Sequence, residues 1–165
     1  IMMERSTSAV TSDSAGKPEE CYHVLLVEDN PGDVGLIRRG LAHRQPPTHL
    51  HVTKDGVQAL DFLRRSATGA APRPDLILLD LNLPQMDGHE LLQHIKGDTA
   101  LKSIPVVVLS SSQAETDVAR SYAQYANCYV TKPLDLEEYL AVIGAVLGGY
   151  VLMQPLLNRV ARRLG

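Results

Sequence analysis

Three apolar runs in this chain each end in a side chain that can do chemistry. Asp80 closes the run 76–79, the pair Glu28 and Asp29 follows the run 23–27, and Lys132 follows the run 127–130. Uninterrupted apolar runs of this length are typical of strands buried on both faces of a parallel sheet. The carboxyl ends of such strands meet at the edge where open α/β sheets bind their ligands. We therefore expect these residues to form one site.

Three carboxylates at one site need a compensating charge. Two carboxylates about 4 Å apart repel by roughly 4 kcal/mol at an effective dielectric constant near 20. A hard divalent cation offsets this repulsion, and Mg²⁺ prefers carboxylates, waters and phosphate oxygens as ligands. Lys132 would add a further positive charge. The pattern predicts a metal-assisted site for an anion, and a phosphoryl group fits it best.

Alternation of strands and helices supplies the scaffold for this site. The expected strands are 23–27, 49–53, 75–79, 105–109 and 127–130, and the expected helices are about 31–43, 56–66, 88–97, 113–125 and from about 135. This alternation predicts an α/β fold, a doubly wound five-stranded parallel sheet with five flanking helices. Right-handed crossovers leave few strand orders. The flavodoxin-like order 2-1-3-4-5 places strand 1 beside strand 3 and brings the three acids together.

Composition limits the function classes. The 165 residues are 44% apolar and 21% charged, with a formal net charge of −3. We expect one domain over residues 21–148, a flexible N-terminal arm over 1–20, and an extension of the last helix over 149–165. The net charge argues against nucleic-acid binding, and no segment is long and apolar enough to span a membrane. Cys21 and Cys128 are expected to be reduced thiols of a cytoplasmic protein.

With these motifs in order, the sequence resembles a bacterial two-component receiver domain over about residues 22 to 148. The matching segments are 27–30, 78–84 with Asp87-Gly88, Ser110 after the fourth strand, and Tyr129 with Lys132-Pro133 after the fifth. Segments 30–33, 55–60 and 104–110 look like the single-domain response regulators that partner phytochrome histidine kinases. The resemblance implies a sensor histidine kinase, here a bacterial phytochrome, as the partner.

The resemblance also implies roles for the acidic residues. Asp80 would be the phosphoacceptor, taking a phosphoryl group from a phosphohistidine to form an acyl phosphate. Glu28 and Asp29 would hold Mg²⁺ together with Asp80. Asn82 would contribute its backbone carbonyl to the metal.

The remaining roles concern the phosphoryl group and the switch. Lys132 would pair with the phosphoryl oxygens, and its peptide bond to Pro133 would be cis. Ser110 would move to the phosphoryl group, and Tyr129 would turn inward behind it. On the residues alone, Tyr129 can equally be a packing residue, and Ser111 or Ser112 can take the place of Ser110.

Several other polar residues have simpler interpretations. Asp87, Asp135 and Glu138 stand where helix-capping acids are expected. His49 and His51 lie on the same face of a strand, but no third ligand has a suitable spacing, so we do not expect a metal site there.

Two other functions compete with the phosphoacceptor interpretation. A phosphoaspartate-forming small-molecule phosphatase would need a second acid two residues after the nucleophile, where Asn82 stands. A phosphorylation-incompetent scaffold is disfavoured because all the hallmark residues are present. The leading hypothesis is a stand-alone phosphoacceptor protein, which catalyses only its own phosphotransfer and dephosphorylation.

The last helix carries two apolar stripes. Leu136, Leu140, Ile143 and Leu147 form an expected core-facing stripe. A second stripe on an adjacent face consists of Tyr139, Val142, Val146, Tyr150 and Met153. So wide an apolar arc predicts a second partner, and we expect a homodimer built on the last helix, the last strand and the tail. Alternatively, the helix packs back on its own domain. Because few residues follow Gly148, we expect signalling by contact rather than DNA binding.

Overall fold

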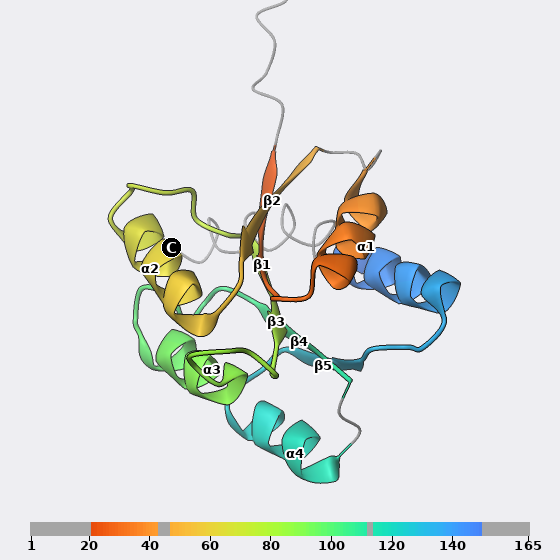
Figure 1. The fold of residues 1–165 in the computed structure, drawn as a ribbon. Helices are drawn as coiled ribbons and strands as arrows, with labels where there is room; N and C mark the ends of the chain where they lie inside the picture. Colours follow the sequence, from red (N-terminus) through yellow and green to blue (C-terminus); the bar gives the residue numbers. More distant parts are fainter. Residues whose placement is uncertain (1–20, 43–46, 112–113, 150–165) are drawn as a thin grey trace, which may run out of the picture.

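A computed structural model describes residues 21–42, 47–111 and 114–149 of the chain. Nine elements follow in order along it. They are β1 (Tyr22–Val27), α1 (Pro31–Leu41), β2 (Thr48–Thr53), α2 (Gly56–Ala67), β3 (Leu76–Asp80), α3 (Gly88–Gly97), β4 (Val106–Ser110), α4 (Glu115–Ala123) and β5 (Cys128–Thr131). A last helix covers residues 136–149 (Figure 1). The expected strands and helices are all found, with shifts of only a few residues at their ends.

The five strands form one parallel sheet in the order β2-β1-β3-β4-β5. This confirms the predicted topology. The register pairs Val27 with Thr53 and Leu79, and it pairs Ser110 with Thr131. The carboxyl ends of neighbouring strands are therefore level, and the residues that follow them share one edge.

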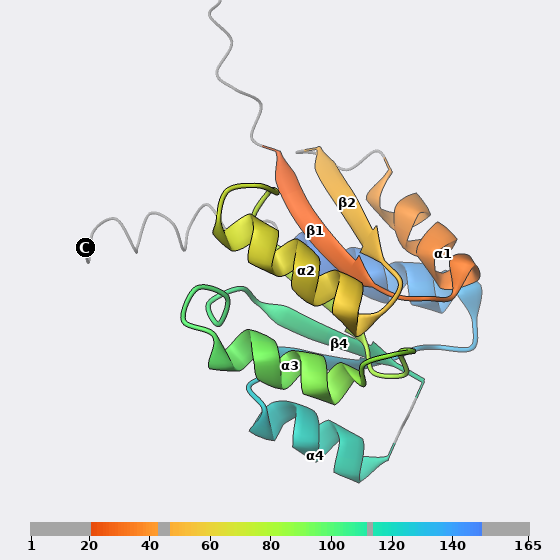
Figure 2. The ribbon, with the colours of Figure 1, turned by 60° about the vertical axis from the view of Figure 1, so that its left-hand side comes forward.

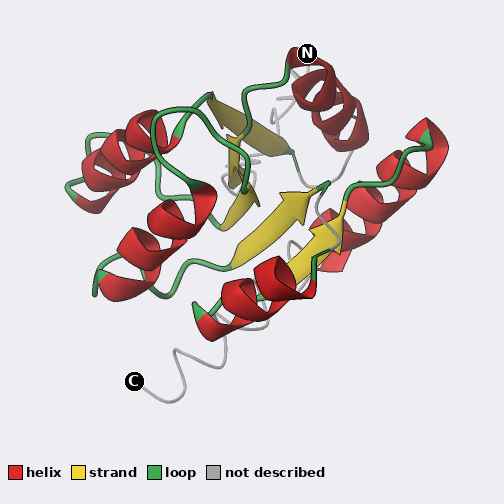
Figure 3. Cartoon of the chain, turned by 60° about the horizontal axis from the view of Figure 1, so that its bottom comes forward, coloured by secondary structure: helices red, strands yellow, loops and turns green. Residues whose placement is uncertain are grey.

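Helices cover both faces of the sheet (Figures 2 and 3). One apolar cluster packs α2 and α3 against the sheet, and the other packs α1 and the last helix against the opposite face. Every residue of β3 and β4 is buried. Central parallel strands have no solvent-facing side, which explains their continuous apolar runs.

Polar residues mark the helix starts. The side chain of Asn30 accepts hydrogen bonds from the backbone N–H groups of Gly32 and Asp33, with Pro31 in the first turn. Asp87 accepts from the N–H of His89 at the start of α3. Asp135 accepts from the N–H of Glu137 and of Glu138 at the start of the last helix. The capping interpretation of Asp87 and Asp135 is thereby confirmed.

The last helix departs from the expected inward stripe at its start, whereas Ile143 and Leu147 are buried as expected. Tyr139, expected on the exposed stripe, is only 3% exposed and packs in the core with Ile143 and Leu147. Leu136, expected in the core, is 46% exposed. Residues 139, 143 and 147 are spaced four apart, so their side chains lie on one face of the helix and point into the core. The expected stripe began instead at Leu136, in the first turn. The assignment of Tyr139 to an exposed interface was wrong.

Candidate functional site

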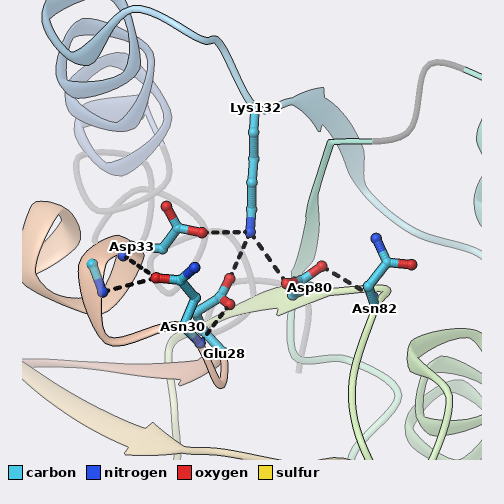
Figure 4. Close-up of polar contacts among 7 residues, drawn as sticks. Glu28, Asn30, Asp33, Asp80, Asn82 and Lys132 are labelled. Carbon is cyan, nitrogen blue, oxygen red and sulfur yellow. Dashed lines mark hydrogen bonds and ion pairs between the residues drawn. The ribbon is translucent and has the colours of Figure 1, made fainter.

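The carboxyl ends of β1, β3 and β5 bring opposite charges into contact. Asp80 is the last residue of β3, Glu28 directly follows β1, and Lys132 directly follows β5. The Nζ atom of Lys132 lies 2.7 Å from Glu28 Oε2 and 3.1 Å from Asp80 Oδ2 (Figure 4). Residues that are distant in the sequence thus meet as the strand-end pattern predicted.

Backbone groups hold the two buried carboxylates in place. Glu28 is 2% exposed and Asp80 is 6% exposed. The N–H of Asn30 donates to Glu28 Oε1 at 3.0 Å, and the N–H of Asn82 donates to Asp80 Oδ1 at 3.0 Å. Each carboxylate therefore has one oxygen bonded to its own loop and the other bonded to Lys132. Protein groups alone therefore hold the carboxylates of Glu28 and Asp80 in position.

A third carboxylate completes an acidic cluster. Ligand oxygens of Glu28, Asp29 and Asp80 all lie within 4.8 Å of one another, and Asp29 is exposed to solvent. Converging carboxylate oxygens with one solvent-facing side suit a hard divalent cation that keeps several of its waters. The residues present therefore fit a divalent metal ion.

Asp33 also belongs to this site, although its role was missed in the sequence. Its Oδ2 atom lies 3.0 Å from Lys132 Nζ (Figure 4). Asp33 lies in the first turn of α1, where an acid is ordinarily explained by the helix dipole. Only the short connection between β1 and α1, which places the start of α1 beside the end of β1, could have indicated this contact.

The carboxylates outnumber the ammonium group of Lys132, and burial and these charges shift the pKa values of Glu28 and Lys132. Burial, with the nearby negative charge of Asp80, raises the pKa of Glu28 to about 7, although the hydrogen bond from Lys132 opposes the change. Burial by itself lowers the pKa of Lys132. The carboxylates of Glu28, Asp80 and Asp33 outweigh that effect and raise it above its ordinary value. Lys132 stays charged, and Glu28 titrates near neutral pH.

The two expected switch residues, Ser110 and Tyr129, lie on the neighbouring strands β4 and β5. Ser110 ends β4, is fully buried, and its carbonyl accepts from the N–H of Lys132 at 2.8 Å. Tyr129 on β5 is half-buried against the cluster under α2 and α3, and its N–H donates to Tyr122 Oη at 3.2 Å. The position of Ser110 beside the site agrees with the expectation. The switching roles of both residues stay predictions, as does the cis peptide bond before Pro133.

Gly88 controls the loop that follows Asp80. A Cβ atom at this position would lie 2.6 Å from the carbonyl oxygen of Asp80 and from the Cα atom of Leu81. The N–H of Gly88 donates to the carbonyl of Leu81 at 3.1 Å. Only glycine allows α3 to begin so close to the end of β3. The Asp87-Gly88 motif therefore has a steric cause.

The predicted interface residues are only partly available. Tyr139 is buried, and Val142 and Val146 are half-buried, with Val146 packed against the core. Tyr150 and Met153 lie outside the described residues.

Among the described segments, no helix is both long enough and apolar enough to cross a membrane.

Comparisons with known proteins agree with this geometry. The chain is 40% identical to the response regulator Rcp1 of Synechocystis sp. over 136 residues, which are 82% of this chain and 90% of Rcp1. It is 41% identical over 120 residues to the probable methanogenesis regulatory protein FilR2 of Methanothrix harundinacea, covering 73% and 77% of the two chains. A crystal structure of the phosphorylated cyanobacterial phytochrome response regulator RcpA superimposes with a TM-score of 0.77 at 42% identity, covering 80% and 95%.

A structure of Rcp1 is of its Mn²⁺-bound form, and it superimposes with a TM-score of 0.73 at 41% identity over 77% of this chain and 92% of Rcp1. A relative of the same fold thus binds a divalent metal ion. The profile of the response regulator receiver domain matches residues 24–144, which include every acidic residue of the site and Lys132. The chain therefore belongs to the response regulator receiver domain family.

Proposed function

We propose that this chain is a phosphoacceptor switch of the cytoplasm, in which Asp80 receives a phosphoryl group from a phosphohistidine of a sensor histidine kinase. One observation carries the proposal. The ammonium group of Lys132 lies within 3.1 Å of three carboxylates, those of Glu28, Asp33 and Asp80, at the carboxyl edge of the sheet. A buried carboxylate with an adjacent fixed cation and an adjacent acidic cluster suits phosphoryl transfer, in which charge stabilisation and positioning do most of the work.

The transfer step follows from the contacts of Asp80. One of its carboxylate oxygens attacks phosphorus, the N–P bond of the phosphohistidine breaks, and the ring nitrogen keeps the electron pair. Asn82 N–H and Lys132 Nζ hold the carboxylate at 3.0 and 3.1 Å, so it needs little reorientation before attack. Lys132, one residue past β5, is placed to neutralise phosphoryl oxygens on the product.

We propose Mg²⁺ as the metal, held by Glu28, Asp29 and Asp80 with the backbone carbonyl of Asn82. The clustering of three carboxylates and the Mn²⁺-bound form of Rcp1 support a divalent ion at this place. Bound Mg²⁺ would neutralise charge on the attacking and transferred oxygens. Glu28 must lose its proton to serve as a ligand, which its pKa of about 7 allows at neutral pH.

The change on phosphorylation is proposed to involve Ser110 and Tyr129. Ser110 lies at the end of the strand beside β3, one register position past the partner of Asp80. Its hydroxyl would move to a phosphoryl oxygen, and Tyr129 on the neighbouring strand would fill the space that this movement leaves. The resulting change would alter the surface around α4, β5 and the last helix, which is where a partner or a second copy would respond.

Light is the proposed input. RcpA is described as a phytochrome response regulator, and both it and Rcp1 cover at least 77% of this chain at about 40% identity. FilR2, which is similarly identical, carries a name from methanogenesis, so the kinase has to be identified by a transfer assay. Phosphotransfer from a purified phytochrome kinase should be faster than from an unrelated histidine kinase. Equal rates would contradict the light input.

Neither alternative has structural support. A phosphatase of the aspartate-nucleophile class would use a second acid at position 82, where the exposed Asn82 stands. A scaffold without phosphorylation would have no need of three carboxylates around one lysine, an arrangement that costs folding stability.

The decisive experiment uses a small phosphoryl donor. The chain is incubated with acetyl phosphate and Mg²⁺, and its intact mass is measured. We expect a single added phosphoryl group that disappears in Asp80→Asn and on chelation of the metal. Asp87→Asn is the matched control, because Asp87 only caps α3. Failure of the wild-type chain to gain mass, or an unchanged gain in Asp80→Asn, would refute the proposal.

A further inference from the structure

Three histidines form a cluster at the end of the sheet opposite to Asp80. His23 comes from β1, and His49 and His51 come from β2. The register pairs His23 with His49 and places His51 beside Leu25, so the three rings share one face. Glu28 lies five positions after His23 along an extended strand, a distance of about 16 Å. This cluster is therefore separate from the acidic site.

The ring of His23 contacts both of the other rings. His23 Nδ1 lies 2.9 Å from His51 Nε2. The ring of His23 stacks on His51 with centroids 5.2 Å apart and on His49 with centroids 5.5 Å apart. His49 is exposed, whereas His23 and His51 are half-buried. Solvent can reach the cluster from the side of His49.

The surroundings keep these rings in position. Phe62 of α2 lies against His51 with centroids 5.1 Å apart. The backbone of His23 is held on both sides by Asp75, whose Oδ2 accepts from His23 N–H at 2.9 Å and whose N–H donates to the His23 carbonyl at 2.7 Å. Arg65 of α2 lies over the Phe62 ring and is paired with Asp61 at 3.0 Å. The backbone of His23 and the ring of His51 are therefore held in position.

The protonation state of the cluster suits ligands. Burial, with the neighbouring rings of His23 and His49, lowers the pKa of His51. A neutral imidazole carries one ring proton and offers a lone pair on its other nitrogen. One proton is shared between His23 Nδ1 and His51 Nε2, and its transfer to an outer nitrogen frees both lone pairs with no change in net charge.

We propose that His23, His49 and His51 form a binding site for a borderline transition-metal ion of the Zn²⁺ class. Imidazole nitrogens bind such ions at about 2.0–2.1 Å, and three histidines with water in the fourth position make an established coordination set. Tetrahedral geometry at that bond length separates two ligand nitrogens by about 3.3 Å, close to the 2.9 Å between His23 and His51. The nitrogens of the three rings do not yet converge as the oxygens of the acidic cluster do, so binding requires the exposed side chain of His49 to change its torsions.

The two metal sites would select different ions. Oxygen ligands of the acidic cluster suit Mg²⁺, whereas imidazoles favour zinc, copper and nickel. Excess Mg²⁺ therefore fills the acidic cluster and leaves the histidines free. A bound ion would also tie β2, an edge strand of the sheet, to β1.

The test is a calorimetric titration of the full chain with Zn²⁺ in buffer that contains millimolar Mg²⁺. We expect one ion per chain. Loss of even an outer-shell partner typically costs about 10- to 100-fold in affinity, so His23→Gln and His51→Gln should each weaken binding by about tenfold or more. His49→Gln should do the same and, because the ring is exposed, without loss of folding. The control is His94→Gln on α3, whose side chain is 47% exposed, and it should bind as the wild type does.

A second measurement keeps the proposal testable if a variant fails to fold. In the wild-type chain, the imidazole resonances of the three histidines should shift together on addition of Zn²⁺, and those of His94 should not. Binding that is unchanged in His49→Gln, or that is lost in Asp29→Asn but kept in the histidine variants, would overturn the proposal. Phosphorylation of Asp80 should be the same in His49→Gln and in the wild type, so the two sites are tested independently.

Discussion

Replacement of Glu28 by glutamine tests the electrostatic design of the acidic site. The pKa of Glu28 rises from its ordinary 4.5 to about 7 in the folded chain. The folded state therefore holds a proton on Glu28 to higher pH than the unfolded state does, and the free energy of unfolding falls as pH rises from 4.5 through 7. At about 1.4 kcal/mol per pKa unit, the ionised group destabilises the fold by about 3 kcal/mol at pH 8 and by less than about 1 kcal/mol at pH 5.

Glutamine removes this titration but also disturbs the hydrogen bonds. Glu28 accepts from Asn30 N–H and from Lys132 Nζ, and the amide of glutamine can accept from only one of these donors. The lost hydrogen bond costs about 1 kcal/mol at any pH. Glu28→Gln should thus be about as stable as the wild type at pH 5 and about 2 kcal/mol more stable at pH 8. Millimolar Mg²⁺ should reduce the advantage at pH 8, because the metal stabilises only the chain with its ligands intact.

Urea unfolding followed by circular dichroism measures this difference, since the chain has no tryptophan for fluorescence. Glu90→Gln is the matched control, because Glu90 is an exposed acid in the first turn of α3 and its replacement should give no comparable pH trend. The reasoning is refuted if Glu28→Gln changes the free energy of unfolding by the same amount at pH 5 and pH 8.

Three further predictions follow from single contacts. Gly88→Ala should destabilise the chain by about 1–3 kcal/mol and slow phosphorylation. Gly97→Ala should be neutral or slightly stabilising, because a Cβ atom there would meet nothing within 4 Å. Urea unfolding of the two variants measures both effects on stability. Tyr139→Phe should be neutral or stabilising by up to about 1 kcal/mol in the same assay, because the buried hydroxyl has no hydrogen-bond partner among the described residues. A loss above about 2 kcal/mol would contradict this. Sedimentation should show a dimer of the full chain and a folded monomer for Leu136→Glu with Val142→Glu, and a wild-type monomer at tens of micromolar would exclude the interface.

The sheet and the acids on it were predictable because their causes are local. A continuous apolar run that ends in a carboxylate fixes both a buried strand and the position of Asp80 at its end. Handedness of the crossovers then left few strand orders, and the order 2-1-3-4-5 brings Glu28 to Asp80. Asp33 was missed because its contact with Lys132 depends on how the first turn of α1 is placed over the sheet.

The pairing of neighbouring strands and the packing of the last helix explain the other differences between the sequence predictions and the structure. His49 and His51 have the spacing of two ligands on one face, but the third ring belongs to the neighbouring strand, and only the pairing of His23 with His49 brings it there. In the last helix, Tyr139 rather than Leu136 begins the stripe that faces the core, although the two positions differ by only about 60° around the helix axis. A pattern of apolar residues indicates that a helix is amphipathic but leaves its rotation to packing against α1 and the sheet.

Charge balance explains why metal and phosphoryl group should act together. Lys132 contacts the carboxylates of Glu28, Asp33 and Asp80, and Asp29 adds a fourth carboxylate to the acidic cluster. A phosphoryl group on Asp80 would add more negative charge to a site that already raises the pKa of Glu28 to about 7. Lys132 alone cannot compensate that charge, because its three contacts are already shared among three acids. We therefore expect phosphorylation to depend on a divalent cation, so that removal of the metal should abolish phosphorylation even though every protein group is in place.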